Sequence, residues 1–351
     1  MDNMLFAGID LHKTQFTVCV LKGNQTIEDN TKYETRAEGY NAFITRLNQI
    51  SEHNPKQVRL AIESTSNSRY FKEMMEKHGF NVTVVNTLRF KVVNLSTKKT
   101  DKNDAKTLAE FLSRDILPQS HLCTAESEGI RRILKSRSLL VQNSVALKNQ
   151  AHAVLLAYGI ITRTAQFQSK KGRDKVLQSL SEDRKKVMSI LFDTLEAIEI
   201  QQKRLERNLR SITKDDEDIR LLMTIPGVGI VNACTIRAYM DEIDRFLTYK
   251  SFSAFCGLVP WVQNSNETVH YGRITKRGPQ ELRTALVQCV VAMVRMGSKT
   301  DNLSIIRQYH LLKEQKSSGK AIIATARKLS RIIYVMLKTK TPFISDRLSD
   351  K

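Results

Sequence analysis

The segment from residue 188 to residue 212 carries a seven-residue repeat, which constrains the fold more than any other feature. One position of the repeat holds Leu191, Ile198, Leu205 and Ile212, and the other holds Met188, Leu195, Gln202 and Leu209. Apolar residues at an average spacing of 3.5 keep one side of a helix facing a partner helix. We therefore expect a long helix, in which the polar Gln202 can fix the register of pairing.

A partner helix is expected earlier in the chain, because a less regular apolar stripe is found there. Its members are Ile130, Leu134, Val141, Val145 and Leu155. Between the two stripes, residues 169–175 are basic and include a glycine, which predicts an exposed turn. An intramolecular helix pair and an intermolecular coiled coil fit this pattern equally well, so both alternatives stay open.

The first 120 residues predict a mixed α/β domain instead. We expect strands at residues 5–11, 16–21, 58–62 and 81–85 and helices at residues 66–78 and 100–113. The first two strands are joined across His12-Lys13-Thr14, as in a hairpin, and the second strand has a period of two. Strands followed by strand–helix alternation are typical of an α/β architecture.

The charge of the chain is strongly positive and unevenly distributed. There are 56 Lys and Arg residues against 36 Asp and Glu residues, a formal net charge of +20. Residues 1–120 hold 17 basic and 14 acidic residues, whereas residues 272–340 hold 15 and 3. Such a surplus favours a nucleic-acid partner, with the basic C-terminal part as the grip, although an uneven solvated surface is the plain alternative.

The composition excludes several other classes of protein. With 41% hydrophobic residues the chain can form cores, which argues against low-complexity disorder. The five cysteines are widely spaced without a C-x-x-C pair, which argues against a disulfide framework or a zinc site and favours a reducing cytosol. No run of eighteen apolar residues and no signal-peptide pattern is found, so we expect a cytoplasmic protein with no membrane partner.

Four carboxylates stand where metal-dependent chemistry would need them. Asp10 lies within the first strand, and Glu63 directly follows Ile62 at the end of the strand expected at 58–62. Asp101 and Asp104 share one helix face through their i, i+3 spacing. Taken singly, each has the plain alternative of a helix cap or a solvated charge. Converging carboxylates repel one another unless a divalent cation balances them, and oxygen ligands suit Mg²⁺ or Mn²⁺.

Three segments around these carboxylates carry a family resemblance. They are G-I-D-L-H-K at residues 8–13, A-I-E-S-T-S at residues 61–66 and K-T-D-K-N-D-A-K at residues 99–106. The order of strand-Asp, strand-Glu and Asp-x-x-Asp helix is similar to the DEDD signature of RuvC-like nucleases with a ribonuclease-H fold. More specifically, the segments resemble the Piv-like DEDD insertion-sequence transposases, now described as bridge-RNA-guided recombinases.

The C-terminal third resembles the second domain of the same family. The passages that carry the likeness are I-P-G-V-G at residues 225–229, F-S-A-F-C-G-L-V-P at residues 252–260 and G-R-I-T-K-R-G at residues 272–278. Between the last two passages the family has a Ser-Ser-Gly triplet, where this chain has Asn264-Ser265-Asn266. The chain departs from the pattern at both flanks, and Ser265 is the only serine between Pro260 and Gly272.

The resemblance implies a composite active site. Asp10, Glu63, Asp101 and Asp104 would bind Mg²⁺ (or Mn²⁺), and Ser265 would attack a DNA phosphate. The cations Arg273, Lys276 and Arg277 would bind phosphates or stabilise developing charge. Gly227 and Gly229 lie in a turn similar to that of helix-hairpin-helix modules, where a backbone can approach a phosphate, with a plain helix-joining turn as the alternative. Trp261 could stack on a base or pack the loop.

The architecture that we expect has three parts. They are an α/β ribonuclease-H-like (RuvC-like) domain over residues 1–125, a helical coiled-coil region over 126–215 and a mainly helical transposase domain over 216–351. The implied function is RNA-guided cleavage and rejoining of donor and target DNA by several protomers. The alternatives are a DNA invertase of the same family, a RuvC-like nuclease or Holliday-junction resolvase that uses water, and a nucleic-acid-binding protein whose acidic residues are structural.

Overall fold

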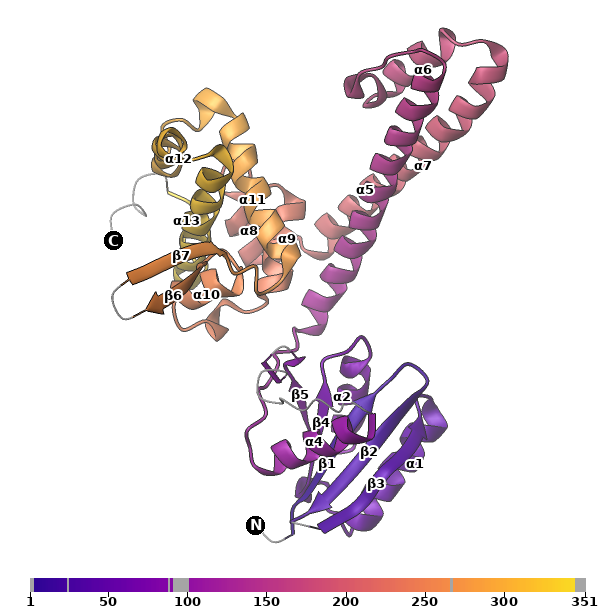
Figure 1. Ribbon diagram of the computed structural model, residues 1–351, viewed down its shortest axis with the longest axis vertical. Coiled ribbons are helices and arrows are strands. Elements are labelled where there is room, and N and C mark those ends of the chain that lie inside the picture. The colour runs from indigo at the N-terminus through magenta and orange to yellow at the C-terminus, as the bar shows by residue number, and fades with distance from the viewer. Residues whose placement is uncertain (1–2, 24, 88, 91–100, 266–267, 345–351) are drawn as a thin grey trace. The chain divides into compact units, whose positions relative to one another are not determined.

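The structure is a computed structural model (Figure 1), which describes residues 3–23, 25–87, 89–90, 101–265 and 268–344. For residues 101–103, 263–265 and 268–271 the description covers the backbone alone. The chain forms two compact units, residues 1–122 and residues 123–351.

The first unit is built on a five-stranded mixed sheet. Its strands are β1 (Leu5–Leu11), β2 (Gln15–Lys22), β3 (Gln25–Glu34), β4 (Val58–Glu63) and β5 (Asn81–Val85), in the order β3-β2-β1-β4-β5. The first three strands pair antiparallel, whereas β4 runs parallel to β1 and to β5. The sheet confirms the expected α/β character and the hairpin between the first two strands, and its order is compatible with a ribonuclease-H-like fold.

One face of this sheet carries the main core of the unit. The helices α1 (Ala37–Ile50) and α2 (Ser68–Lys77) contribute to this core. Phe16 of β2 lies at its centre, with ring centroids 5.4 Å from Phe43 and 5.7 Å from Phe71. Large aromatic side chains bury much apolar area, so this cluster stabilises the helices on the sheet.

The opposite face is covered by α4 (Asp101–Ser113), which packs on β1, β2 and β4. The close approach depends on Gly8, because a Cβ there would collide with the backbone of Ala105 and Ala109. Leu108 and Leu112 continue the buried side of the helix over Ala61 of β4. The helix expected at residues 100–113 is therefore confirmed, and the glycine of the G-I-D segment has a packing role.

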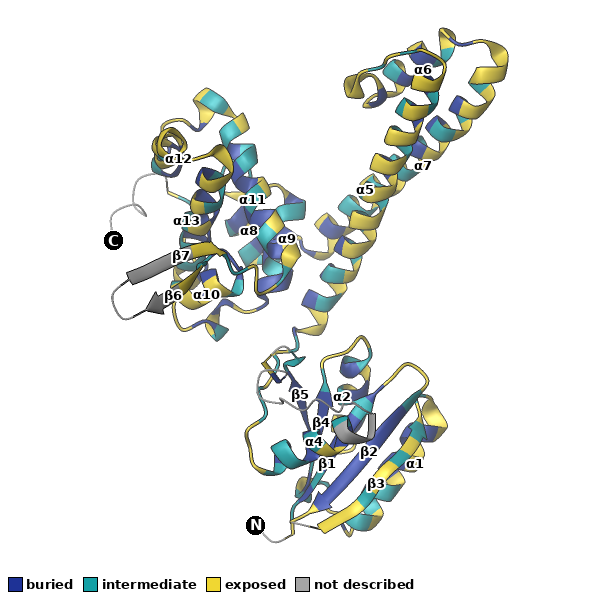
Figure 2. Ribbon diagram, viewed as in Figure 1, coloured by how far each residue is buried: buried dark blue, intermediate teal, exposed yellow. Residues whose placement is uncertain are grey.

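Two elements of the first unit were not predicted by apolar periodicity, namely β3 and α1. Eight of the ten residues of β3 are polar or charged, and none of its residues is buried. Figure 2 shows this edge strand in the colours of exposed and half-buried residues beside the dark blue of β2. An edge strand with a solvated face carries little of the alternation that identifies half-buried strands.

The second unit begins with two long helices that pack against each other, α5 (Ala125–Ala157) and α7 (Glu182–Ile212). Of the two positions of the repeat, the one with Met188, Leu195 and Leu209 is buried, whereas Ile212 at the other is 48% exposed. Arg137 of α5 bonds Glu206 of α7 at 2.7 Å. The intramolecular helix pair is therefore present, and an additional intermolecular coiled coil stays a prediction.

The prediction of an exposed turn at residues 169–175 was wrong. Residues Lys170–Gln178 form α6, which Ser169 caps by accepting a hydrogen bond from the Gly172 amide at 3.1 Å. Arg173 is buried, and its two terminal nitrogens donate to the carboxylate of Glu199 at 3.1 and 3.0 Å. The segment is thus a helix in which Lys170 and Arg173 pair with Glu196 and Glu199 of α7, while most of residues 169–175 are exposed as expected.

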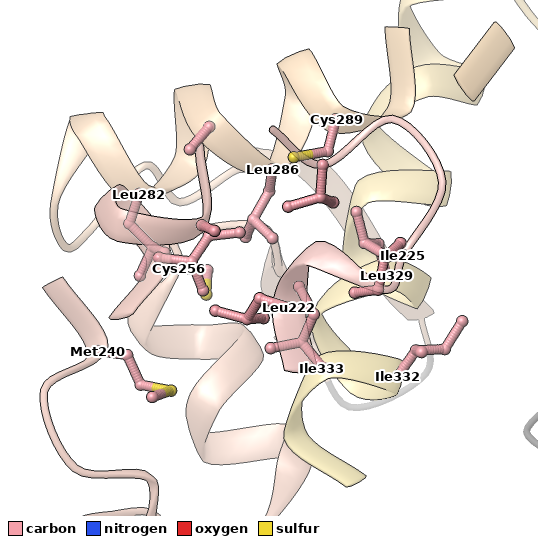
Figure 3. Packing of buried hydrophobic residues seen from close by; sticks show 14 of the residues in the cluster. Leu222, Ile225, Met240, Cys256, Leu282, Leu286, Cys289, Leu329, Ile332 and Ile333 are labelled. Atoms are coloured by element: carbon pink, nitrogen blue, oxygen red, sulfur yellow. The ribbon is translucent and has the colours of Figure 1, made fainter. Parts of the chain in front are cut away.

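The remaining helices form one apolar core. They are α8 (Glu217–Met223), α9 (Ile230–Met240), α10 (Tyr249–Phe255), α11 (Gln280–Arg295), α12 (Ser304–Gln315) and α13 (Ser318–Thr339). Two 3-10 turns, η3 (Ile243–Arg245) and η4 (Gly297–Lys299), lie between these helices. Two more occur earlier in the chain, η1 (Pro55–Gln57) in the first unit and η2 (Thr164–Phe167) between α5 and α6. Figure 3 shows Leu222, Leu286 and Ile333 gathered in this core. The mainly helical character expected for this part of the chain is confirmed by these elements.

The cysteines lie inside the two units as free thiols, all five of them buried. Burial raises the pKa of Cys234 to about 11 and that of Cys289 to about 12. Such thiols are poor nucleophiles near neutral pH. Among the described residues, no helix is long and apolar enough to cross a membrane.

Candidate active site

Asp10 and Glu63 lie at neighbouring positions on parallel strands. The register pairs Gly8 with Ala61 and Ile9 with Ile62, and each carboxylate follows directly after the last of these pairs. Because side chains alternate along a strand, both carboxylates share the face of Gly8 and Ala61, which α4 covers. The sheet therefore brings together two residues that are 53 positions apart in the sequence.

The surroundings of Asp10 are partly closed to solvent. Its side chain is 16% exposed, and its Oδ2 lies 3.0 Å from Nε2 of His12. On the β2 side it is paired with Thr17, which is fully buried and whose hydroxyl has no hydrogen-bond partner among the described residues. A buried polar atom without a partner is costly, so a further polar group at this position would stabilise the site.

The helix α4 supplies the other two carboxylates of the set. Its first residue is Asp101, whose side chain lies outside the description, and Asp104 is half-buried directly before the buried Ala105. Among the side chains that the structure describes, no three His, Cys, Asp or Glu residues gather closely enough to hold a metal ion. A complete four-carboxylate centre therefore stays a prediction.

The described residues nevertheless fit a divalent cation. Two half-buried carboxylates at adjacent positions repel each other, and a hard cation relieves that repulsion through oxygen ligands. Beside Asp10, the buried hydroxyl of Thr17 lacks a hydrogen-bond partner among the described residues and adds one further oxygen to the polar groups at this position. Asp10 and Glu63 are the residues of the first unit that we expect to hold the cation.

Ser265 lies at the tip of a hairpin in the second unit. The hairpin consists of β6 (Pro260–Ser265) and β7 (Thr268–Ile274), and Ser265 pairs with Thr268 as the last pair before the tip. The described part of the segment between Pro260 and Ile274 is therefore strand. The side chain of Ser265 lies outside the description, so its role stays a prediction.

The base of the hairpin is locked by the two glycine-containing passages on either side. Gly257 and Gly278 have φ angles of +68° and +103°, which side chains other than glycine's rarely tolerate. A Cβ at Gly278 would collide with the carbonyl oxygen of Phe255. Arg283 donates to the carbonyl oxygen of Lys276 at 3.2 Å. The glycines of the two passages that carry the family resemblance are therefore required by the packing at the base of the hairpin.

Cations and one aromatic ring flank the hairpin. Arg273, Lys276 and Arg277 are all exposed, as a contact with phosphates would require. Trp261 is 51% exposed, and its ring lies over Gly272, where a Cβ would come within 3.0 Å of Cε3. Trp261 therefore packs along the hairpin and still leaves half of its surface open for stacking.

The turn before α9 combines a packed glycine and an open one. A Cβ at Gly227 would lie 2.9 Å from the backbone nitrogen of Met293 on α11, so this glycine permits a helix contact. Gly229 is the N-terminal cap of α9 and has open space around it. Gly227 thus has a packing role, whereas an approach of phosphate to Gly229 stays a prediction.

Sequence patterns missed the polar neighbours of Asp10, which are His12 and Thr17. Both follow from the hairpin that the sequence did predict. His12 is two residues after Asp10 and so on the same side of an extended chain, and the register of the hairpin sets Thr17 opposite Asp10. The register was not available from apolar periodicity alone.

Comparisons with known families match both regions just described. Residues 7–160 match a family of transposases with the DEDD motif of the IS110 type. Residues 219–304 match the family described as "Transposase IS116/IS110/IS902 family". The first range contains the four carboxylates and the second contains Ser265.

Individual relatives cover most of the chain. The transposase for insertion sequence element IS1111A of Coxiella burnetii is 31% identical over 69% of this chain and 68% of its own length. The transposase for insertion sequence element IS1328 of Yersinia enterocolitica is 28% identical over 98% of this chain and 99% of its own length. A probable family 20 transposase of Pseudomonas aeruginosa is 27% identical over 80% of this chain and 84% of its own length.

Proposed function

The chain belongs to the IS110-type DEDD transposases, enzymes that act on DNA, and on that premise we propose how it cleaves and rejoins DNA strands. The proposed reaction uses carboxylates of the first unit to hold Mg²⁺ or Mn²⁺ and Ser265 of the second unit as the nucleophile. The observation that supports it best is the adjacent placement of Asp10 and Glu63 under α4. The first unit would adopt a RuvC-like, ribonuclease-H-like fold.

The carboxylates are proposed to provide the ligands of a divalent cation. Asp10 and Glu63 would hold it from the sheet, and Asp101 and Asp104 would hold it from α4. When bound, such a cation would supply positive charge that stabilises the reacting phosphate. The ring of His12, 3.0 Å from Asp10, orients that carboxylate.

Ser265 forms a transient bond with the DNA. Its hydroxyl oxygen attacks the phosphorus and loses its proton, the bond from phosphorus to one deoxyribose oxygen breaks, and that oxygen takes up a proton. The phosphoserine ester retains the energy of the broken bond, so a strand hydroxyl can later reverse the step and rejoin DNA. Arg273, Lys276 and Arg277 bind the phosphates that flank the attacked bond.

The basic helices of the second unit bind nucleic acid over a wider area. Residues 272–340 hold 15 basic and 3 acidic residues, and the apolar sides of α12 and α13 are turned into the core. We propose that these helices hold DNA and a structured guide RNA through phosphates, while base pairing with the RNA selects the sequence. Several protomers would assemble on the DNA and mobilise an insertion sequence.

A nuclease in which water attacks the phosphate is the rival function. The two mechanisms separate when Mg²⁺-dependent cleavage of labelled DNA is measured with three variants, Asp10→Asn, Ser265→Ala and the exposed control Ser136→Ala. We expect Asp10→Asn and Ser265→Ala to lower cleavage to background and Ser136→Ala to cleave like the parent. Cleavage that survives Ser265→Ala but not Asp10→Asn would instead establish the nuclease.

A further inference from the structure

A chain of hydrogen bonds joins the loop that follows β1 to the loop that follows β4. The hydroxyl of Thr65 donates to the amide oxygen of Asn67 at 2.9 Å. The amide nitrogen of Asn67 donates to the carbonyl oxygen of His12 at 3.1 Å. Asn67 is thus bonded at both ends of its amide, to one group from each loop.

These loops follow directly after the two adjacent carboxylates. Glu63 is the last residue of β4 and lies four residues before Asn67, and His12 lies two residues after Asp10. The ring of His12 contacts Asp10 at 3.0 Å, while its carbonyl accepts the bond from Asn67. Outside the sheet, the amide of Asn67 therefore links the chain just after Glu63 to the chain just after Asp10 by a hydrogen bond.

The turn at His12 is also fixed from other directions. Its backbone amide donates to the carbonyl oxygen of Gln15 at 3.0 Å, and the hydroxyl of Thr35 donates to the His12 carbonyl at 3.1 Å. Thr35 directly follows β3, on the side away from β4. The same carbonyl thus accepts one bond from each side, and only the bond from Asn67 reaches the loop of Glu63.

Among the described residues, the side chain of Asn67 makes hydrogen bonds only to Thr65 and His12, while its backbone carbonyl accepts from the Phe71 amide at 3.1 Å. Asn67 occupies the N-terminal cap position of α2, yet its side chain makes no capping hydrogen bond. It is half-buried and does not belong to the apolar core. Its amide is therefore available to set the distance between the two loops without being needed for the helix.

We propose that Asn67 is a positioning residue that holds the Asp10 and Glu63 carboxylates at the separation a divalent cation requires. This inference rests on the proposed function, because it presupposes that the pair binds a cation. Repulsion between the carboxylates favours a wider separation before the cation binds, and the bridge through Asn67 opposes that spreading. Partners behind metal ligands commonly change metal affinity about 10- to 100-fold.

The test is Mn²⁺ binding by the full-length chain without nucleic acid, followed by the electron paramagnetic resonance signal of free Mn²⁺. We expect Asn67→Ala to weaken Mn²⁺ binding about tenfold and Thr65→Val, which removes only the bond to the amide oxygen, to weaken it about threefold. The matched control is Thr35→Val, which removes a bond to the same His12 carbonyl and leaves the bridge intact. We expect it to bind Mn²⁺ like the parent.

Cleavage at rising Mg²⁺ provides the second readout. Asn67→Ala should need about tenfold more Mg²⁺ for half-maximal cleavage and reach a maximal rate close to that of the parent. Parent-like Mn²⁺ binding by Asn67→Ala, or an equal loss in Thr35→Val, would overturn the positioning role. If Asn67→Ala lacks the far-ultraviolet circular dichroism of the parent, Thr65→Val decides by the same criterion, with parent-like binding counting against the role.

One further variant separates this inference from the function on which it rests. Asp10→Asn should abolish Mn²⁺ binding in the same experiment. Undiminished binding by Asp10→Asn would show that Asp10 does not hold the Mn²⁺, and both proposals would then be wrong. Loss of binding in Asp10→Asn together with parent-like binding in both Asn67→Ala and Thr65→Val would leave the metal site standing and refute only the role of Asn67.

Discussion

The two candidate catalytic regions are positioned by different kinds of structure. Asp10 and Glu63 are placed side by side by the register of two neighbouring strands, and α4 covers the sheet face that they share. Ser265 lies at the tip of a two-stranded hairpin whose base is locked by Gly257 and Gly278. A site that must hold a cation gains from a rigid sheet, whereas a nucleophile that must reach DNA gains from a projecting hairpin.

The two regions also differ in the net charge of the chain around them. The first 120 residues hold 17 basic and 14 acidic residues, whereas residues 272–340 hold 15 and 3. Carboxylates that bind a cation are best placed away from competing basic side chains, and a nucleophile that attacks phosphate is best placed among them. The comparison explains why a large net charge can coexist with an acidic site.

The largest expected effect tests whether the sheet carboxylates are required for cleavage. Glu63→Gln removes one charge from the adjacent pair, so we expect metal-dependent DNA cleavage to fall to background. Binding of DNA to the basic second unit should change less than twofold, which a filter-binding titration measures. Cleavage by Glu63→Gln at the rate of the parent would contradict the metal role of the sheet.

The next effect tests how firmly α4 is held on the sheet. Gly8→Ala places a Cβ against the backbone of Ala105 and Ala109, so we expect the first unit to lose about 3 kcal/mol of unfolding free energy. The matched control is Gly129→Ala, since Gly129 lies in α5 with open space around it. This control should gain about 0.5 kcal/mol in the second unit. Urea unfolding measures both, and a Gly8→Ala variant as stable as the parent would contradict the packing.

Alkaline pH should lower the unfolding free energy of the two units over different pH ranges. The pKa of Cys234 in the second unit is raised by burial to about 11, above its ordinary value of 9.0. A raised folded-state pKa contributes stability that is present below pH 9 and is lost as the pH rises toward 11. In the first unit, burial raises the pKa of Tyr40 from 10.0 to about 12, so its contribution is lost only between pH 10 and pH 12.

Urea unfolding between pH 8 and pH 11 checks this difference. The unfolding free energy of the second unit should fall above pH 9, and the fall should be smaller in Cys234→Ala, in which the titrating thiol is absent. An equal fall in both proteins would show that other groups dominate.

The smallest effect concerns the helix pair. The side-chain nitrogen of Gln202 is buried without a hydrogen-bond partner among the described residues, at the one polar position of the repeat. Gln202→Leu removes an unsatisfied polar group, so we expect about 1 kcal/mol of added stability in thermal unfolding. The neighbouring Gln201 is exposed, and Gln201→Leu should change stability by less than about 0.5 kcal/mol. Destabilisation by Gln202→Leu would show that its amide is satisfied in solution.

The elements that the sequence predicted well are those with strong apolar periodicity. The strands around Asp10 and Glu63 and the helix after Thr100 were predicted because their buried faces are nearly uninterrupted. The strand β3 was missed because its residues are mostly polar, and α6 was mistaken for a turn because Arg173 finds a buried partner in Glu199. Local patterns report burial, and they do not report which distant group neutralises a charge.

The candidate site was predictable in its residue types but not in its arrangement. Asp10 and Glu63 were chosen as strand residues, whereas their adjacency depends on the parallel pairing of β1 with β4. The bridge from Thr65 through Asn67 to His12 joins positions 12 and 67, and no periodic pattern connects loops so far apart. Polar networks of this kind depend on tertiary structure and had to be observed.

The central claim is that the nucleophile resides on the hairpin and the cation site on the sheet. The most direct measurement is to trap the reaction of the parent chain with guide RNA, DNA and Mg²⁺, digest the protein and identify the nucleotide-bearing peptide by mass spectrometry. We expect a phosphate ester on Ser265 that forms with Mg²⁺ and is absent in Asp10→Asn. Cleaved DNA without any protein adduct, or an adduct on a residue other than Ser265, would contradict it.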